Sequence, residues 1–414
     1  FETKDKIFIG ELSLDGGLRP ISGSLSISRL AKKLGFKFLF LPKENAAEAA
    51  IIKGMNIVPV SNLIELVDFL EERKEMVFQK PFQIKFDSIN EESLIGISDI
   101  KGQESAKRAL TVAAAGGHNI LMSGPPGAGK TMLAQALISI LPLPSLDEII
   151  ETTQIYSAAG ALGNNPFVNF RPFRAPHHSA SMVSVIGGGA NPKPGEISLA
   201  HRGILFLDEI PEFRRDLLES LRQPLESGTI CVSRAKSILN FPARFTLVAA
   251  MNPCPCGYFG DNEKVCRCSA HEVFRYQKKI SGPLLDRIDL QLSVPRVKIE
   301  ELRKGKEENI TEQIRARVIN ARKIQEERFK KIRQPAEQKI YLNSEITSKM
   351  VDEVIDLDDE SQNFLKNILE KSFISARGYY RILKTARTIA DLEESEKVGQ
   401  KHLAEAFQYR IRES

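Results

Sequence analysis

Apolar runs bounded by polar turns alternate along this chain with segments whose apolar residues recur at helical spacing. Residues 119–122, 203–207 and 245–251 are almost uninterrupted apolar runs, which is typical of strands buried on both faces of a parallel sheet. Residues 132–138 follow the first run with the spacing of a helix. Beyond residue 300 the pattern predicts only helices, at residues 310–332, 375–392 and 401–410. The fold class predicted is therefore α/β, with a parallel-sheet core followed by a helical region.

The first part of the chain contains both short strand-like apolar segments and segments with helical spacing, and so predicts a separate α+β domain. Short strands are expected at residues 7–12 and 38–41, and helices around residues 27–34 and 61–70. A polar, acidic stretch at residues 85–93 has the composition of a linker. The domains expected from these patterns are an N-terminal domain, a linker, a core and a helical lid, at residues 1–82, 83–97, 98–297 and 298–414.

Length and composition agree with several domains. A chain of 414 residues exceeds what one hydrophobic core organises, and 42% hydrophobic residues can fill more than one. The net charge of +5 is mildly basic and does not by itself indicate a nucleic-acid partner. No apolar run approaches about 18 residues and no signal peptide is visible, so we expect a cytoplasmic protein without a membrane partner. The first residue is Phe1, so we expect the chain to begin inside a longer protein.

One loop matches G-x-x-x-x-G-K-[ST] at every fixed position. Its residues are Gly124, Pro125, Pro126, Gly127, Ala128, Gly129, Lys130 and Thr131. Glycines let backbone N–H groups surround a phosphate chain, and the following helix N-terminus adds positive potential. Lys130 is predicted to reach the β- and γ-phosphates, and Thr131 to offer its hydroxyl to Mg²⁺. Because an apolar run precedes the loop and a helix follows it, we expect ATP binding rather than a plain turn.

Two carboxylates follow the apolar run 203–207. Asp208 is predicted to bind Mg²⁺ together with Thr131, and Glu209 to orient and polarise the attacking water. Two acids after a strand can instead begin the next helix. The phosphate loop upstream favours the catalytic interpretation, because acids and loop meet where parallel strands end.

Polar and basic residues downstream complete the candidate site. Asn252 follows the run 245–251, with a turn-forming Asn before Pro as the alternative. Arg287 and Arg377 are candidates to stabilise the charge that develops in phosphoryl transfer, with a surface ion pair as the alternative for each.

The cysteines form two closely spaced pairs. Cys254 and Cys256 make one C-x-C, and Cys266 and Cys268 make another after a short polar loop. Four thiolates can close a tetrahedral Zn²⁺ site that staples a loop without its own core. Free thiols are the alternative. The fifth cysteine, Cys231, is expected to be a buried, small apolar residue.

Several long and unusual stretches carry a resemblance to a known family. They are residues 171–179, 195–203, 251–257, 281–289 and 386–392. Over essentially its whole length, the chain resembles the ComM/YifB family of magnesium-chelatase-like AAA+ ATPases. The resemblance implies an AAA+ P-loop core with a helical lid, and a homo-hexameric ring that acts on single-stranded or branched DNA as a branch-migration helicase. A chelatase-like ATPase that remodels a protein partner is the alternative.

The resemblance also implies roles for single residues. Asn252 would lie beside the γ-phosphate, Arg287 would act as a finger from the neighbouring subunit, and Arg377 would act as the lid sensor of its own subunit. Arg381, one turn further on, is the alternative sensor. Gly102 and Gln103 would line the adenine pocket.

The N-terminal segment resembles the C-terminal half of a Lon-protease-like domain, through residues 10–16 and 41–45. Lon enzymes use a Ser-Lys pair, and Leu25 occupies the place of the lysine here. Because leucine cannot take a proton, we expect a non-proteolytic domain.

Two further segments are candidates for projections from the core. The glycine- and proline-rich residues 184–195 match an insertion that marks the chelatase-like clade. A hairpin is expected around residues 230–238, where Arg234 and Lys236 are candidate contacts to DNA phosphates and a solvated hairpin is the alternative. Adjacent side chains diverge on strands and helices, so His177 and His178 are not expected to share one metal ion.

Overall fold

The computed structural model describes residues 2–80, 95–163, 165–189, 192–233, 238–261, 263–303, 309–332, 340–371 and 374–410. The chain forms two compact units. The first unit comprises Phe1–Ile89, Leu143–Phe170 and Gly187–Leu199, and the second comprises Asn90–Pro142, Arg171–Ile186 and Ala200–Ser414. Each unit therefore takes in more than one stretch of the chain. The expected linker at residues 85–93 lies outside the described residues.

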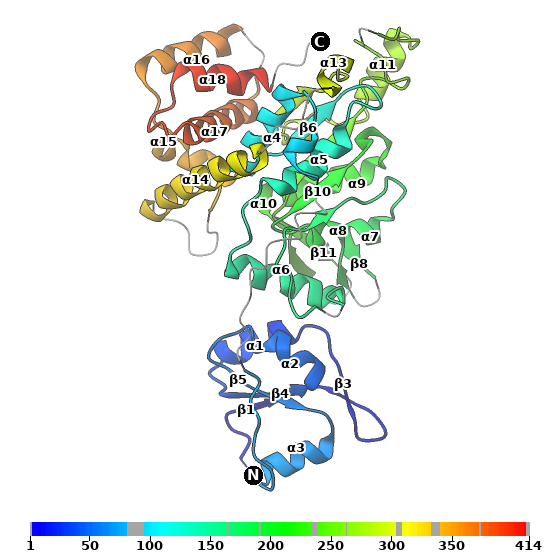
Figure 1. Ribbon diagram of the computed structural model, residues 1–414, viewed down its shortest axis with the longest axis vertical. Helices are drawn as coiled ribbons and strands as arrows, with labels where there is room; N and C mark the ends of the chain where they lie inside the picture. Colours follow the sequence, from blue (N-terminus) through cyan, green and yellow to red (C-terminus); the bar gives the residue numbers. More distant parts are fainter. Residues whose placement is uncertain are drawn as a thin grey trace. The chain divides into compact units, whose positions relative to one another are not determined.

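The first unit contains a three-stranded parallel sheet in the order β1-β4-β5. Leu39 and Leu41 on the central strand are fully buried, because both faces of this strand are covered. The strands and helices, blue in Figure 1, are β1 (Lys6–Phe8), β2 (Glu11–Leu12), β3 (Leu18–Arg19), α1 (Ser24–Lys33), β4 (Phe38–Pro42), α2 (Lys43–Ala49), β5 (Asn56–Val60) and α3 (Leu63–Leu70).

Helix α6 (Leu146–Ala159) belongs to the first unit and packs on α1. Leu25 is fully buried in an apolar cluster with Ile51, Ile150 and Phe167. The backbone N–H of Gly23 donates to Ser157 Oγ at 2.7 Å. Leucine at this position thus serves packing. The unit also contains β8 (Gly187–Gly188), β9 (Lys193–Pro194) and α8 (Glu196–Leu199).

The second unit is built on a five-stranded sheet in the order β14-β6-β13-β10-β7, with every neighbouring pair parallel. The strands are β6 (Ile120–Ser123), β7 (Phe173–Arg174), β10 (Ile204–Leu207), β13 (Thr246–Met251) and β14 (Leu290–Ser293). All four residues of β10 are buried, as expected for a strand covered on both faces. The predicted α/β class with a parallel sheet is confirmed.

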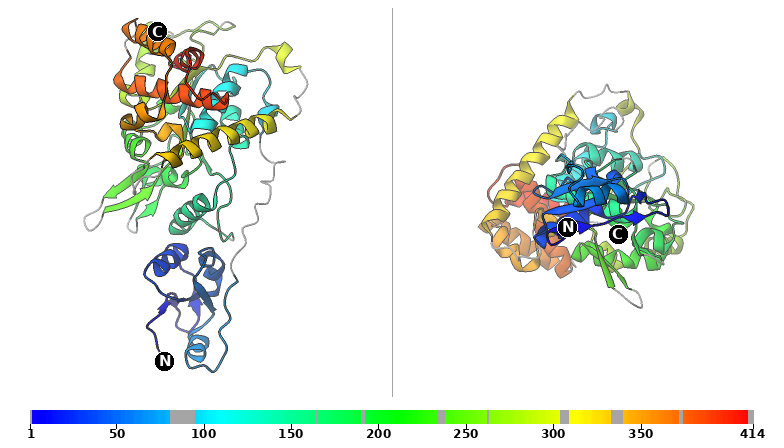
Figure 2. Two further views of the ribbon diagram at one scale, coloured as in Figure 1. Left: turned by 90° about the vertical axis from the view of Figure 1, so that its left-hand side faces the viewer. Right: turned by 90° about the horizontal axis from the view of Figure 1, so that it is seen from below.

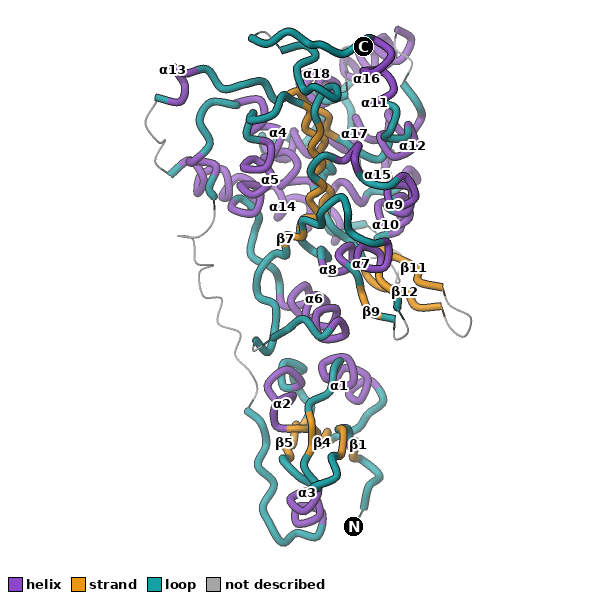
Figure 3. Tube along the Cα trace, turned by 90° about the vertical axis from the view of Figure 1, so that its right-hand side faces the viewer, coloured by secondary structure: helices purple, strands orange, loops and turns teal. Residues whose placement is uncertain are grey.

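Helices lie on both sides of this sheet, with α4 and α5 on one side and α9 and α10 on the other (Figure 3). They are η2 (Ile97–Asp99), α4 (Glu104–Gly116), α5 (Lys130–Ser139), α7 (Met182–Ile186), η3 (Ile210–Glu212), α9 (Arg215–Ser220), α10 (Arg222–Ser227), α11 (Ala270–Gln277) and α12 (Gly282–Leu285).

An antiparallel hairpin extends from the core (Figure 2). It consists of β11 (Thr229–Ser233) and β12 (Ile238–Pro242), with Thr229 opposite Pro242. The hairpin that the sequence predicts is present. Its candidate DNA contacts, Arg234 and Lys236, lie outside the described residues.

The C-terminal region is helical, as predicted, and α14 and α17 pack against α4 of the core. Its elements are α13 (Ile299–Leu302), α14 (Ile310–Lys331), η4 (Asn343–Glu345), η5 (Ser348–Met350), α15 (Val351–Val354), α16 (Asp359–Lys371), α17 (Ala376–Leu392) and α18 (Gln400–Gln408). In the part of the chain that the structure describes, no helix is long and apolar enough to cross a membrane.

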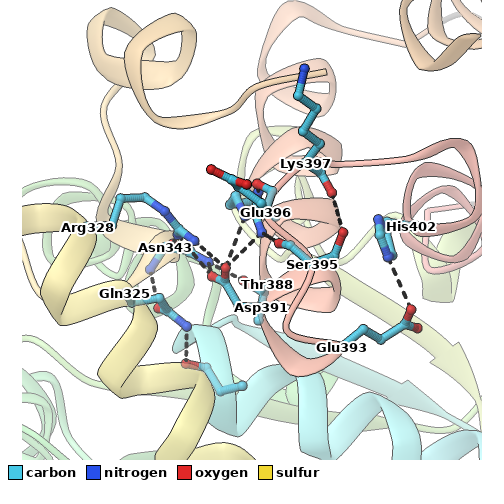
Figure 4. Close-up of polar contacts among 12 residues, drawn as sticks. Gln325, Arg328, Asn343, Thr388, Asp391, Glu393, Ser395, Glu396, Lys397 and His402 are labelled. Carbon is cyan, nitrogen blue, oxygen red and sulfur yellow. Dashed lines mark hydrogen bonds and ion pairs between the residues drawn. The ribbon is translucent and has the colours of Figure 1, made fainter. Parts of the chain in front are cut away.

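A buried carboxylate organises this helical region (Figure 4). Asp391 accepts hydrogen bonds from Arg328 Nη1 at 3.0 Å, Asn343 Nδ2 at 2.8 Å and Arg387 Nε at 3.1 Å. Gln325 Nε2 donates to the carbonyl of Ala115 at 3.1 Å and so joins α14 to α4. Arg387 and Asp391 therefore hold the lid together.

Candidate nucleotide-binding site

The loop between β6 and α5 has the backbone of a phosphate-binding loop. Gly127 and Gly129 have φ of 80° and 85°, and Gly129 caps α5. A Cβ on Gly124 would lie 2.1 Å from the carbonyl oxygen of Val294. Glycine at these positions permits the left-handed turns and the close approach of the neighbouring backbone.

Lys130 lies across this loop. Its Nζ donates to the carbonyls of Gly124 at 2.6 Å and Pro125 at 3.0 Å, and to Asn252 Oδ1 at 3.1 Å. Burial lowers the pKa of Lys130, while the charges of Asp208 and Glu209 raise it. The amine is thus held among oxygen atoms at the position where a phosphate chain would pass.

The two candidate Mg²⁺ ligands come together from different elements. Thr131 Oγ1 on α5 donates to Asp208 Oδ2, after β10, at 3.1 Å. A hydroxyl beside a carboxylate is a donor set of hard oxygens, which suits Mg²⁺. Both residues fit the ion expected from the sequence.

Glu209 lies next to this pair in an unusual backbone conformation. Its φ is 50°, which is left-handed, and its N–H donates to Asp208 Oδ1 at 2.9 Å. Its side chain is exposed. Strained conformations of this kind concentrate at functional sites, because surrounding structure must hold them.

Asn252 stands between the loop and the acids because of the strand order. β13, which ends at Met251, lies between β6 and β10 in a parallel sheet, so the three strand ends share one edge. The structure thus brings Lys130, Asp208 and Asn252 together. Gln103 lies at the start of α4, directly after Gly102, and has a φ of 60°. Its Nε2 donates to the carbonyl of Pro295, the residue after Val294, which closely approaches Gly124 of the phosphate loop.

Arg287 and Arg377 meet at a separate place. Arg287 pairs through Nη2 with Glu226 Oε1 on α10, and Arg377 Nη2 lies 3.6 Å from the same oxygen. Arg287 Nη1 also donates to the carbonyl of Pro283 at 2.6 Å. Among the described residues, no hydrogen bond or ion pair joins either arginine to the phosphate loop, Asp208 or Asn252.

Comparison with known proteins gives the family. A model described as magnesium chelatase, subunit ChlI, matches residues 96–302, a second for the ChlI C-terminal part matches residues 308–410, and a third for subunit ChlI of Mg-chelatase matches residues 1–45. The Competence protein ComM of Haemophilus influenzae is 43% identical over 406 residues, covering 97% of this chain and 77% of that protein. The chain belongs to the ComM/YifB family of magnesium-chelatase-like proteins. It is thus a ChlI-like AAA+ ATPase.

Two further relatives of this ATPase match it to different extents. The protein YifB of Escherichia coli is 41% identical over 405 residues, covering 97% of this chain and 76% of YifB. The magnesium-chelatase 38 kDa subunit of Cereibacter sphaeroides is 27% identical over 184 residues, 38% of this chain and 52% of that subunit.

Arg381 of the ATPase is engaged in a buried network, unlike Arg377. It pairs with Asp289, whose carboxylate also accepts from the N–H of Asn119 at 3.0 Å and lies 3.6 Å from His118 Nδ1. Burial alone would raise the pKa of Asp289, but Arg381 and His118 hold it well below its usual range. Arg381 therefore joins α17 to the sheet, whereas the side chain of Arg377 is 55% exposed.

The four paired cysteines of the ATPase converge on one point. Sγ of Cys254 lies 3.3 Å from Sγ of Cys256 and 3.7 Å from Sγ of Cys266, and all four Sγ atoms lie within 4.8 Å of one another. Cys268 completes this group. Cys231 stands outside it on β11 and is partly exposed, so the expectation of a buried Cys231 is wrong; β11 belongs to the extended hairpin and not to the core sheet.

The two adjacent histidines do not diverge as expected. The rings of His177 and His178 lie against each other with centroids 4.0 Å apart and planes tilted by 35°, because the backbone there is neither strand nor helix. His177 Nδ1 lies 2.7 Å from Ser179 Oγ, and His178 packs edge-on to Phe213. Arg171 in the same motif is buried and donates to the carbonyl of Pro142 at 2.9 Å.

Sequence reasoning missed two residues of the ATPase. Glu226 lies in a short helix without a recognisable motif, so no signal pointed to it. Gly257 meets the phosphate loop, since a Cβ there would lie 2.7 Å from Pro126 Cδ. The left-handed φ of 86° at Gly257 could have been suspected from the preceding Pro-Cys-Pro-Cys sequence, which favours a turn. Its contact with Pro126 could not have been predicted from the sequence.

Proposed function

We propose that this ATPase is a ring motor that hydrolyses ATP to act on single-stranded or branched DNA, as a branch-migration helicase. The observation that carries the proposal is the convergence of Lys130, Thr131, Asp208, Glu209 and Asn252 at one edge of the sheet. This set contains a group for each task of phosphoryl transfer to water.

The roles follow from the chemistry of each side chain. Lys130 would bind the β- and γ-phosphates, and Thr131 and Asp208 would hold Mg²⁺, which supplies charge neutralisation on the phosphate oxygens. Glu209, exposed beside Asp208, would accept a proton from the attacking water. Asn252 would fix the position of that water through its amide.

The arginines support assembly into a ring. In the part of the chain that the structure describes, neither Arg287 nor Arg377 contacts the phosphate loop, so neither would reach a nucleotide of its own subunit in this arrangement. We propose that Arg287 reaches the nucleotide of a neighbouring copy in a homo-hexamer. Because Arg377 lies at the same Glu226 oxygen, we propose that it acts in the same direction and not on its own subunit.

The DNA-directed part of the proposal has separate support. The hairpin β11–β12 extends from the core and is suited to reach a strand in a central pore. The name of the relative, Competence protein ComM, supports a role in natural transformation and recombination. The second candidate function, a chelatase-like ATPase that remodels a protein, has support from the likeness to the magnesium-chelatase 38 kDa subunit.

ATP hydrolysis with and without DNA separates the two functions. The full chain is assayed alone, with single-stranded DNA, and with a four-way junction, at increasing salt. A DNA motor predicts stimulation by DNA that falls steeply as salt rises, because phosphate contacts release counterions. Hydrolysis that no DNA changes would contradict the motor and favour protein remodelling.

We also propose a structural Zn²⁺ ion on Cys254, Cys256, Cys266 and Cys268. Sulfur atoms about 2.3 Å from a central ion in a regular tetrahedron lie about 3.8 Å apart. The Sγ separations among Cys254, Cys256 and Cys266 are 3.3, 3.6 and 3.7 Å, and Cys268 Sγ lies within 4.8 Å of each, which fits one ion. An iron–sulfur cluster spreads its cysteines around several iron atoms and fits less well.

The ion would staple a loop that has no core of its own. Within residues 252–269 the side chains of Phe259 and Val265 are exposed, so apolar packing contributes little. This loop begins at Asn252, and Gly257 packs on Pro126 of the phosphate loop. Zn²⁺ would therefore supply the rigidity that keeps Asn252 in place.

A further inference from the structure

Two guanidinium groups converge on one carboxylate oxygen in the second unit. Glu226 Oε1 pairs with Arg287 Nη2 and lies 3.6 Å from Arg377 Nη2. Glu226 lies on α10, Arg287 is the second residue after the end of α12, and Arg377 lies in the first turn of α17. Opposite charges from three elements therefore meet at a single atom.

The exposures of these side chains differ sharply. The side chain of Arg287 is 3% exposed, whereas those of Glu226 and Arg377 are 51% and 55% exposed. Arg287 Nε is also buried without a hydrogen-bond partner. A charge this deeply buried depends on its counter-ion, because losing one partner of a buried pair leaves an uncompensated charge.

The position of Arg287 conflicts with a finger that must reach another chain. Nη1 is held by the carbonyl of Pro283 and Nη2 by Glu226, so the group is retracted. A trans-acting arginine has to leave this position before it can touch a phosphate outside its own chain. The carboxylate of Glu226 occupies the place on both arginines that an anionic phosphate oxygen would take.

Glu226 is also close to the hairpin along the chain. α10 ends at Ser227, Gly228 follows with a φ of 67°, and β11 begins at Thr229. Gly228 is fixed at both sides, since its N–H donates to Pro224 at 2.9 Å and its carbonyl accepts from Ala243 at 2.8 Å. Gly228 therefore connects the hairpin directly to α10, the helix that carries Glu226.

We propose that Glu226 is a positioning residue that holds Arg287 and Arg377 retracted, and that movement of the hairpin releases both arginines toward a nucleotide held by a neighbouring copy. The inference rests on the proposed ring ATPase for its target. Its first part, the retention of Arg287 by Glu226, concerns the isolated chain and is testable without any catalytic activity.

Modification of arginines by phenylglyoxal, followed by mass spectrometry of the full chain, measures the retention. In the wild-type protein, phenylglyoxal labels Arg377 quickly and Arg287 slowly. In Glu226→Gln the labelling rate of Arg287 rises by at least about tenfold, because a buried guanidinium without its counter-ion turns outward. Glu226→Asp keeps the charge and restores slow labelling. Glu219→Gln, which removes a carboxylate paired with Arg222 at 2.9 Å, leaves Arg287 protected.

ATP hydrolysis tests the consequence. Glu226→Gln hydrolyses ATP without DNA at least about fivefold faster, because the arginines are no longer held back by the carboxylate, and DNA stimulates it less. Its affinity for a fluorescent ATP analogue stays unchanged, since Glu226 does not touch the phosphate loop. Unchanged labelling of Arg287 in a folded Glu226→Gln protein overturns the proposal. If Arg287 of Glu226→Gln is labelled quickly but neither this variant nor the wild-type protein hydrolyses ATP, Glu226 still retains Arg287, and the proposed ring ATPase is overturned instead.

Discussion

The amine of Lys130 lies 3.1 Å from Oδ1 of Asn252, although 122 positions separate the two residues in the chain. The contact exists because β13 lies between β6 and β10 and ends at the same edge. We propose that the amide, fixed there by the lysine, orients the attacking water.

Asn252→Ala is therefore expected to bind ATP with unchanged affinity and to hydrolyse it about 100-fold more slowly, the loss usual for one removed polar group at a transition state. Titration with a fluorescent ATP analogue and steady-state phosphate release measure the two quantities. A loss of affinity with unchanged turnover would assign Asn252 to binding.

The cysteine cluster predicts about one Zn²⁺ ion per chain of purified protein. Cys266→Ser is expected to lose the ion, because three sulfur ligands and one hydroxyl bind it less tightly. Cys231→Ser serves as the matched control and keeps the ion, since Cys231 lies outside the cluster. Elemental mass spectrometry measures the number of Zn²⁺ ions per chain. A purified protein that contains no zinc and has normal stability would contradict the zinc site and indicate four free thiols.

Asp289 makes the stability of the second unit depend on pH. Its pKa in the folded chain lies below the usual value, mainly because Arg381 and His118 outweigh burial. The ion pair thus stabilises the fold fully above the ordinary carboxyl pKa of about 3.9, and this stabilisation is lost as pH falls below that value. Thermal unfolding of the protein between pH 3 and pH 7, which spans about one unit below and three above that value, measures the loss.

Asp289→Asn is expected to cost about 3 kcal/mol of unfolding free energy at neutral pH, because it removes the fully buried charged partner of Arg381, whose side chain is 16% exposed. Asp216→Asn removes an exposed partner of Arg214 and is expected to change the unfolding free energy far less than Asp289→Asn does. Equal effects of the two substitutions would contradict the buried pair.

Leu25 links the N-terminal domain to α6. Leu25→Ala is expected to lower the unfolding free energy of the first unit by about 2–5 kcal/mol, the cost of a cavity at a fully buried leucine. Leu30→Ala on the same helix is the control, since Leu30 is 55% exposed. Limited proteolysis of the first unit compares them. Equal susceptibility would contradict the packing of Leu25.

The sequence predicted three of the five core strands, β6, β10 and β13, and their polar ends, because apolar runs and the phosphate loop carry strong local signals. β7 and β14 were not predicted, since segments of two and four residues are too short to show a clear period. The pairing of Arg381 with Asp289 depends on a contact between distant segments, and the contact of the His177 and His178 rings depends on an irregular backbone, neither of which periodicity encodes. The same holds for Glu226, whose importance comes only from the two arginines that meet there.

Hydrolysis by Glu209→Gln tests the central claim most directly. The substitution keeps the size of the side chain and removes only its ability to accept a proton, so ATP binding should persist. We predict unchanged affinity for ATP and a fall in phosphate release of at least about 100-fold relative to the unmodified protein. Near-normal phosphate release by a folded Glu209→Gln protein would contradict the assignment of this edge of the sheet as the site of ATP hydrolysis.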